Sequence, residues 1–187
     1  RGRNLRKIGQ HAQDTAELFF DQVRVPASHL LGEEGQGFKY LMQKLAQERL
    51  LVSVQCQARA EAVLDWTVAY VKERRAFRQR VADFQNTRFV LAGVSADLAA
   101  GRAYCDQLIA RHLAGALDAA GAAAGKLWHS ELLGRVADHC LQLFGGYGYM
   151  AEYPVARAYI DARIERIYAG TSEIMKEIVA RDLLDEK

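Results

Sequence analysis

Proline is scarce in this chain, and long apolar runs are missing. Only two prolines, Pro26 and Pro154, occur among 187 residues, so most of the sequence lacks the residue that interrupts helices. No stretch approaches the roughly 20 consecutive apolar residues of a membrane-spanning helix, and no secretory signal peptide is recognisable. We therefore expect long helices and no membrane span.

Cysteine and net charge are also low. The three cysteines, Cys56, Cys105 and Cys140, lie far apart without metal-ligand spacing, which predicts buried, reduced thiols, a reducing intracellular compartment and no metal site. The formal net charge of +2 gives no indication of nucleic acid or an anionic membrane as a partner. Hydrophobic residues make up 50% of the chain, which is enough for a buried core.

The first thirty residues differ from the rest. Runs rich in β-branched and aromatic residues at 15–20 and 22–25 precede Pro26, a pattern that predicts two short strands and a turn. Two strands do not form a stable domain alone. Residues 1–30 are therefore predicted to be the end of a β domain whose front half is missing, and the start at Arg1 rather than Met agrees with this.

The remainder, residues 31–187, has the periodicity of helices. Apolar residues recur at steps of three and four, as at Leu98, Cys105 and Leu108. Helices are expected at about 37–75, 83–116 and 118–144, followed by a shorter pair at 153–163 and 172–184. The predicted fold class is all-α, an antiparallel helical bundle preceded by a remnant of a β domain.

Glu48 lies on the apolar stripe of the first expected helix, in step with Val52 and Cys56. A carboxylate half removed from water has a raised pKa, which suits a general base working near neutral pH. An exposed helical Glu paired with Arg49 or Lys44 would produce the same pattern without any chemistry. Periodicity alone leaves both interpretations open.

Three further segments have both a structural and a functional interpretation. The glycine-rich run at 142–149 suits either a helix C-cap or a backbone that approaches a ligand closely. The run at 167–174 offers Thr171 or Ser172 as an ordinary N-cap, or free N–H groups for a phosphate or an oxyanion. The basic run at 72–78 suits either a solvated helix end or an arginine clamp on a pyrophosphate.

In this order, the segments resemble the C-terminal portion of the acyl-CoA dehydrogenase family over essentially the whole chain. The residues at 47–51 and 174–181 resemble the long-chain subgroup, and those at 14–26 resemble the end of the family's middle β domain. The resemblance implies oxidation of acyl-CoA to trans-2-enoyl-CoA. A base removes the α-proton, a hydride passes to N5 of FAD, and the electrons go to an electron-transfer flavoprotein.

The position of the base departs from the family's common pattern. Most members carry the catalytic Glu before the last Gly-Thr, where this chain has Ala169. The long-chain and isovaleryl-type branches instead carry the base on the first helix, where Glu48 stands. The resemblance therefore implies Glu48 as the base, and the backbone N–H of Ala169 as a donor to the thioester carbonyl.

The resemblance also implies a set of binding residues. Arg74 is expected at the FAD pyrophosphate, and Arg49, Tyr168 and Gly170 on the substrate side. The other implied FAD contacts are Phe77, Gln85, Gln142, Leu143, Phe144, Gly145, Gly146, Thr171 and Glu173. Some of these serve a neighbouring subunit in the family, which implies a homotetramer built as a dimer of dimers. Arg78 stands where the family usually has Gly, and it is strained if that turn needs a positive φ.

Other functions remain compatible with the sequence. The same chemistry could act on isovaleryl-CoA or another specialised thioester, or run as an oxidase. A non-catalytic helical assembly module would keep the fold without the reaction. The expected compartment is the cytoplasm of a bacterium or the mitochondrial matrix of a eukaryote.

Overall fold

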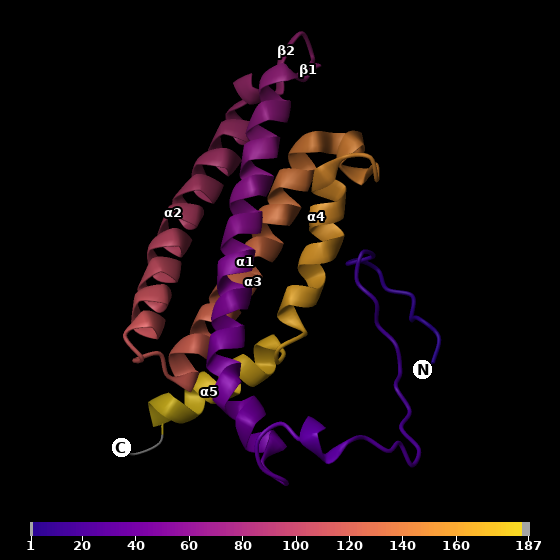
Figure 1. Ribbon diagram of the computed structural model, residues 1–187. Helices are drawn as coiled ribbons and strands as arrows, with labels where there is room; N and C mark the ends of the chain where they lie inside the picture. The colour runs from indigo at the N-terminus through magenta and orange to yellow at the C-terminus, as the bar shows by residue number, and fades with distance from the viewer. Residues whose placement is uncertain (1, 185–187) are drawn as a thin grey trace.

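The computed structural model describes residues 2–184, and most of that chain is a bundle of long helices (Figure 1). The helices are α1 (Gly37–Glu73), α2 (Gln85–Leu113), α3 (Ala119–Phe144), α4 (Pro154–Ala162) and α5 (Ser172–Leu184), with 3-10 turns at Ala27–His29, Val81–Asp83, Gly145–Tyr149 and Arg163–Arg166. Each long helix lies within its expected range, so the all-α prediction is confirmed. Within residues 2–184, no helix combines the length and apolar character needed to cross a bilayer.

Helix α3 is the centre of the bundle. It packs against α1, α2 and α4, and α5 crosses its lower end (Figure 1). The core consists of apolar side chains from these helices, including Cys56, Ala60, Val63, Leu98, Leu132, Leu133, Val136 and Cys140. Each large apolar side chain buried here contributes about 1.5–3 kcal/mol of transfer free energy. All three cysteines are free and buried, as predicted.

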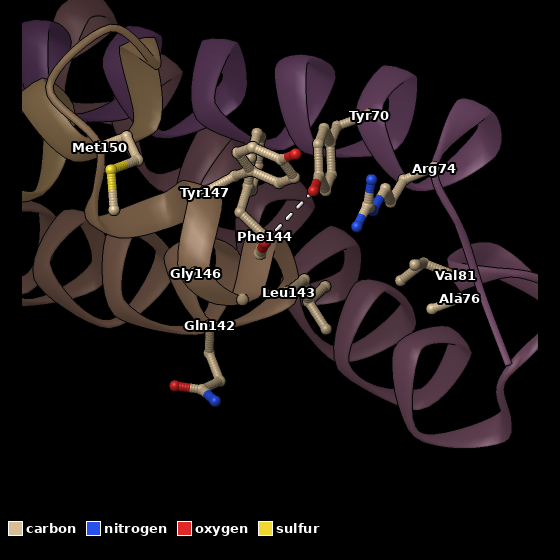
Figure 2. Close-up of a pocket in the computed structure, with 11 residues that line it drawn as sticks. Tyr70, Arg74, Ala76, Val81, Gln142, Leu143, Phe144, Gly146, Tyr147 and Met150 are labelled. Atoms are coloured by element: carbon tan, nitrogen blue, oxygen red, sulfur yellow. Dashed lines mark hydrogen bonds between the residues drawn. The ribbon is translucent and has the colours of Figure 1, made fainter.

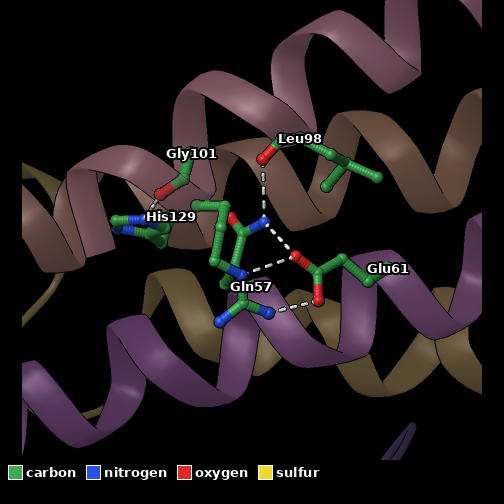
Figure 3. A network of polar contacts seen from close by, with 6 residues as sticks. Gln57, Glu61, Leu98, Gly101 and His129 are labelled. Carbon is green, nitrogen blue, oxygen red and sulfur yellow. Dashed lines mark hydrogen bonds and ion pairs between the residues drawn. The ribbon is translucent and has the colours of Figure 1, made fainter. Parts of the chain in front are cut away.

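A buried polar network ties three helices together (Figure 3). The side-chain amide of Gln57 in α1 donates to the Leu98 carbonyl of α2 at 3.0 Å and to Glu61 at 2.8 Å. The ring nitrogens of His129 in α3 lie 3.0 Å from the Gly101 carbonyl of α2 and 2.8 Å from a carbonyl one turn earlier in α3. A Cβ at Gly101 would lie 2.5 Å from the Gln57 side-chain oxygen. Glycine therefore allows α2 to approach this closely.

Local residues explain where α3 and α4 begin and end. The Asp118 carboxylate accepts the Gly121 N–H at 2.6 Å, which caps the first turn of α3. Gly145 ends that helix with a φ of 58°, a left-handed conformation that glycine adopts readily. Pro154 occupies the first turn of α4, where a missing N–H removes no helical hydrogen bond.

A small hairpin that the sequence did not predict joins α1 to α2. Its strands, β1 (Arg75–Ala76) and β2 (Gln79–Arg80), pair antiparallel (Figure 1). The turn residues Phe77 and Arg78 have φ values of 49° and 71°. A two-residue turn of this hand favours Asn and Gly, and neither is present. The turn at position 78 therefore does need a positive φ, which costs Arg about 1–2 kcal/mol.

The strands expected at 15–20 and 22–25 are a wrong prediction. Residues 2–36 contain one isolated bridge, between Asn4 and Ala16, and no longer strand. Strand-forming residues need neighbouring strands to pair with. The described chain supplies only residues 2–5 there, where the Gly2 and Leu5 N–H groups donate to carbonyls of residues 17 and 15. The segment touches the bundle at α4, where the Gln10 N–H donates to the Asp161 carboxylate. Gly9 is buried at this contact.

Candidate functional site

An open groove of about 510 Å³ lies where the C-terminal ends of α1 and α3 meet the hairpin (Figure 2). It is lined by Tyr70, Arg74, Ala76, Val81, Gln142, Leu143, Phe144, Gly145, Gly146, Tyr147 and Met150. Six residues expected to bind the cofactor, Arg74 and those at 142–146, therefore meet in one place. They come from two helices that are far apart in the sequence.

Aromatic rings and one guanidinium shape this groove. The rings of Tyr70 and Phe144 stack with centroids 4.0 Å apart, and the Tyr70 hydroxyl donates to the Phe144 carbonyl at 3.2 Å. Burial raises the pKa of Tyr70, which keeps that donor protonated. The Arg74 guanidinium lies over the Tyr147 ring, 4.9 Å from its centroid. A planar guanidinium held against an aromatic ring is suited to bind phosphate oxygens.

The glycines leave the groove open along the backbone. A Cβ built at Gly145 or Gly146 would meet nothing within 4 Å, so a ligand can approach the main chain there. The residues present, one cation, flat apolar walls and accessible backbone, fit the phosphate-bearing part of a dinucleotide.

Two expected cofactor residues lie outside the groove. The Phe77 side chain is 91% exposed at the hairpin tip, and its ring centroid lies 6.3 Å from that of Phe84. Gln85 is the first residue of α2 and is also exposed. Ala76 of β1 lines the groove, whereas Phe77 lies in the turn beyond the strand and does not.

The loop before α5 is a second unusual region. Ala169 and Gly170 have φ values of 52° and 97°, and Ala169 packs against the core. The Thr171 hydroxyl accepts the Ile174 N–H at 3.3 Å, so Thr171 is the N-cap that the sequence offered as one choice. Glu173 follows in the first turn, where hydrogen bonds from the backbone and from Thr171 lower the pKa of its carboxyl group.

Beneath this loop lies a fully buried lysine. Lys126 of α3 is completely inaccessible, and its ammonium group donates to the Gly170 carbonyl at 2.7 Å. Burial lowers the pKa of Lys126, while the nearby Glu165 carboxylate acts in the opposite direction.

A buried carboxylate holds the other side of the loop. Glu165 is fully buried and pairs with the Arg59 guanidinium of α1. It also accepts the Tyr168 hydroxyl and, at 3.7 Å, the Cys56 thiol. Burial and the bond to Glu165 raise the pKa of Tyr168 and of Cys56. Both groups therefore remain protonated hydrogen-bond donors.

Glu48 is exposed in the described chain, which is the position that the structural interpretation of its stripe expected and not the half-buried one that suits a general base. Its apolar stripe continues to Leu41, which is itself 66% exposed. The first buried residue of α1 is Arg49, although the helix start has neighbours, such as the Glu33 N–H that donates to the Tyr40 hydroxyl.

Arg49 follows Glu48 on α1 and lies near the lysine beneath the loop. Its side chain is 6% exposed, and burial lowers its pKa against the opposing effect of Glu48. Within residues 2–184, the buried Nε of Arg49 has no hydrogen-bond partner. Arg49 and Lys126 lie close enough for their charges to repel. The Glu48–Arg49 turn, Lys126 and the Gly170 carbonyl therefore occupy one region of the molecule.

Sequence reasoning missed the charges that support the loop, the buried Lys126 and Glu165 and the partly exposed Arg59. A signal for Lys126 existed, because it falls on the apolar stripe of α3 in step with Ala122 and Leu133. The criterion that selected Glu48 would also have selected this lysine. Glu165 lies in a short 3-10 turn, which offers no periodic pattern from which to predict burial.

Comparisons with known proteins agree with these observations. The family model described as "Acyl-CoA dehydrogenase, C-terminal domain" matches residues 35–184. The long-chain specific acyl-CoA dehydrogenase of Sus scrofa mitochondria is 50% identical over 187 residues, which is 100% of this chain and 44% of that protein. The chain thus spans about half the length of the curated relatives it matches.

Two solved structures have the same fold. An acyl-CoA dehydrogenase from Geobacillus kaustophilus superimposes with a TM-score of 0.94 at 50% identity, covering 98% of this chain and 48% of that one. The butyryl-CoA dehydrogenase of Megasphaera elsdenii superimposes with a TM-score of 0.92 at 38% identity, with coverages of 98% and 48%. With a family model over most of its length and relatives of this identity, the chain belongs to the acyl-CoA dehydrogenase family.

Proposed function

We propose that the protein containing this chain is an FAD-dependent dehydrogenase that converts long-chain acyl-CoA into trans-2-enoyl-CoA. Its electrons would pass to an electron-transfer flavoprotein. In this proposal, residues 1–30 are the end of the middle β domain and residues 31–187 are the C-terminal helical domain. The observation that carries the proposal is the pairing of Ala169, which has no acidic side chain, with Glu48 on α1. Arg49, next to Glu48, lies near Lys126, which bonds this loop at the Gly170 carbonyl.

The proposed reaction divides proton removal and carbonyl polarisation between two elements. The Glu48 carboxylate takes the α-proton, and the Ala169 N–H donates to the thioester carbonyl oxygen, where negative charge develops. One such donor is typically worth about 3–4 kcal/mol in the transition state. When bound, the flavin supplies the acceptor for the β-hydrogen, which leaves as a hydride. Arg49, Tyr168 and Gly170 would line the substrate side.

The cofactor residues divide between the groove and more exposed positions. Arg74 would bind the FAD pyrophosphate, and the backbone at 142–146 would face the adenosine side. Phe77 and Gln85 lie outside the groove, and Thr171 and Glu173 belong to the start of α5. In a homotetramer, Arg74, Gln85 and the backbone at 142–146 would contact the FAD of a neighbouring subunit. Thr171 and Glu173 would contact FAD within their own subunit or at the dimer contact. The nearly complete exposure of the Phe77 ring supports a contact between subunits.

A long acyl chain is the substrate that this chain's own surface favours. Leu41 and Met42 precede Glu48 on α1 and are 66% and 50% exposed. Leu41 lies two turns before Glu48 on the same side of α1 and would offer apolar surface near the proposed base. The greater identity to a long-chain enzyme (50%) than to a butyryl-CoA enzyme (38%) supports the same choice. Isovaleryl-CoA is the alternative, because isovaleryl-type enzymes also carry the base on this helix.

The test is the anaerobic absorbance of the flavin in the full-length protein after addition of palmitoyl-CoA, with isovaleryl-CoA in parallel. Bleaching by palmitoyl-CoA is the expected result. Bleaching by isovaleryl-CoA alone would keep the mechanism and change the substrate. A yellow protein bleached by neither would point to another thioester, and a colourless protein to an assembly module. Peroxide formation in air would identify an oxidase.

A further inference from the structure

We propose that Lys126 is a positioning residue, which holds the loop bearing the Ala169 N–H in the orientation that the reaction needs. It would act through the Gly170 carbonyl, while Glu165 holds the opposite side of the loop through Tyr168. The inference rests on the proposed function and assigns roles to buried charges that the reaction itself does not use.

The loop needs support because its backbone is not in a relaxed conformation. Ala169 has a φ of 52°, a left-handed conformation that costs an L-residue free energy relative to the right-handed one. The direction of an N–H group is set by the dihedral angles on either side of it. A loop free to relax at Ala169 would therefore turn its donor away from the thioester oxygen.

Lys126 fixes the residue after Ala169. Its ammonium group reaches the Gly170 carbonyl from inside the bundle, at 2.7 Å, and is fully buried. A buried ammonium needs a strong acceptor, so this bond resists being broken. On the other side of Gly170, a Cβ would lie 2.6 Å from the end of the Met175 side chain. The Gly170 peptide is thus held between α3 and α5.

Glu165 fixes the residue before Ala169. The Tyr168 hydroxyl donates to this buried carboxylate, which also pairs with Arg59 of α1. Both sequence neighbours of Ala169 are therefore held by buried charged side chains. Glu48, the proposed base, lies on the same helix as Arg59. The donor and the base are thereby fixed relative to a common element.

The experiment compares Lys126→Met with the matched control Lys176→Met, an exposed lysine on α5, in the full-length flavoprotein. Flavin reduction by palmitoyl-CoA is measured by anaerobic stopped-flow. A second readout is the long-wavelength absorbance of bound 3-thiaacyl-CoA, whose α-proton can be removed although no hydride can leave from sulfur. FAD content and the dissociation constant for the thioester are measured in both variants.

In Lys126→Met, we expect flavin reduction to slow by about 10- to 100-fold, the loss typical of a misplacement near 1 Å. The 3-thiaacyl band should weaken, while thioester affinity changes less than about threefold. The Lys176→Met control should behave as the wild type. If Lys126→Met does not retain FAD, Tyr168→Phe tests the other anchor without removing a charge, and a weaker band is again expected.

The experiment distinguishes failure of the positioning role from failure of the proposed function. Wild-type protein reduced by palmitoyl-CoA, together with Lys126→Met or Tyr168→Phe reduced equally fast and with an unchanged 3-thiaacyl band, would overturn the positioning role and leave the proposed function intact. Wild-type protein that is not reduced by any acyl-CoA would remove the proposed function, and the role of Lys126 would fall with it.

Discussion

The groove at Arg74 and the loop at Ala169 are built in opposite ways. The groove consists of exposed groups, aromatic faces and open glycine backbone. The loop stands on buried charges, with Lys126 on one side and Glu165 on the other. A surface that receives a ligand can stay open until the ligand arrives, whereas a backbone donor must be held in place beforehand.

The contrast predicts different consequences of substitution. Changes around the loop should affect the reaction or the stability of the fold. Changes in the groove should affect cofactor affinity and leave the fold intact, because surface substitutions seldom alter the free energy of unfolding by more than about 0.5 kcal/mol.

The largest effect is expected at Glu48. Glu48→Gln should slow flavin reduction by palmitoyl-CoA by about 100- to 10,000-fold, the range for loss of a general base. FAD content should not change, because Glu48 is exposed and far along α1 from the groove. Asp65→Asn, an exposed carboxylate on the same helix, is the matched control. Rapid reduction of the Glu48→Gln protein would exclude this residue as the base.

The next effect is on stability at the loop. Glu165→Leu should lower the free energy of unfolding by about 3 kcal/mol, the lower end of the range for breaking a buried pair, because the partner Arg59 is partly solvated. Urea denaturation followed by circular dichroism measures this change. Glu177→Leu removes an exposed ion pair with Arg181 and should change stability by less than about 1 kcal/mol. Equal losses of unfolding free energy in the two variants would contradict the view that buried charges support the loop.

A smaller effect is expected in the groove. Arg74→Gln should weaken FAD binding by about 10- to 100-fold, because a hydrogen bond to a charged group is worth about 1.5–3 kcal/mol. Its unfolding midpoint without FAD should match the wild type. Arg75→Gln, a neighbour that does not line the groove, is the control. Fluorescence titration of the apoprotein with FAD measures the affinities, and identical values for both variants would remove Arg74 from the site.

No effect is expected at the thiols. Cys56, Cys105 and Cys140 are fully buried, and burial raises the pKa of each thiol. A disulfide reagent at pH 8 should therefore modify none of them within minutes in the folded protein, and all three after denaturation. A rapidly modified thiol in the folded state would show that the helical core opens more easily than its packing implies.

How much the sequence predicts depends on how far apart the interacting residues lie. Helical periodicity located the helices because it is a local signal. The glycine-rich run at 142–149 left a helix cap and a ligand-facing backbone both open. The strands at 15–20 and 22–25 were wrong because strand residues need partners from elsewhere. The hairpin at Phe77 and Arg78 was missed because neither Phe nor Arg is a residue that usually forms a two-residue hairpin turn.

The burial of individual charges was the least predictable property. Glu48 and Lys126 both lie on apolar stripes, yet only Lys126 is buried. The stripe on α3 faces other helices, whereas the described chain buries no residue of α1 before Arg49. Periodicity shows which side of a helix is apolar, and tertiary packing decides whether that side is covered.

The central claim is that Glu48 on α1 removes the α-proton while the Ala169 N–H polarises the carbonyl. The most direct test is to transfer the carboxylate from position 48 to position 169. Flavin reduction by palmitoyl-CoA should be compared in Glu48→Gln and in Glu48→Gln combined with Ala169→Glu, with both proteins containing FAD. If the α1 and loop positions serve the same substrate carbon, the double variant should be reduced at least about tenfold faster than the single variant, a partial return of general-base catalysis. A double variant that binds FAD and palmitoyl-CoA but is reduced no faster than the single variant would contradict the account.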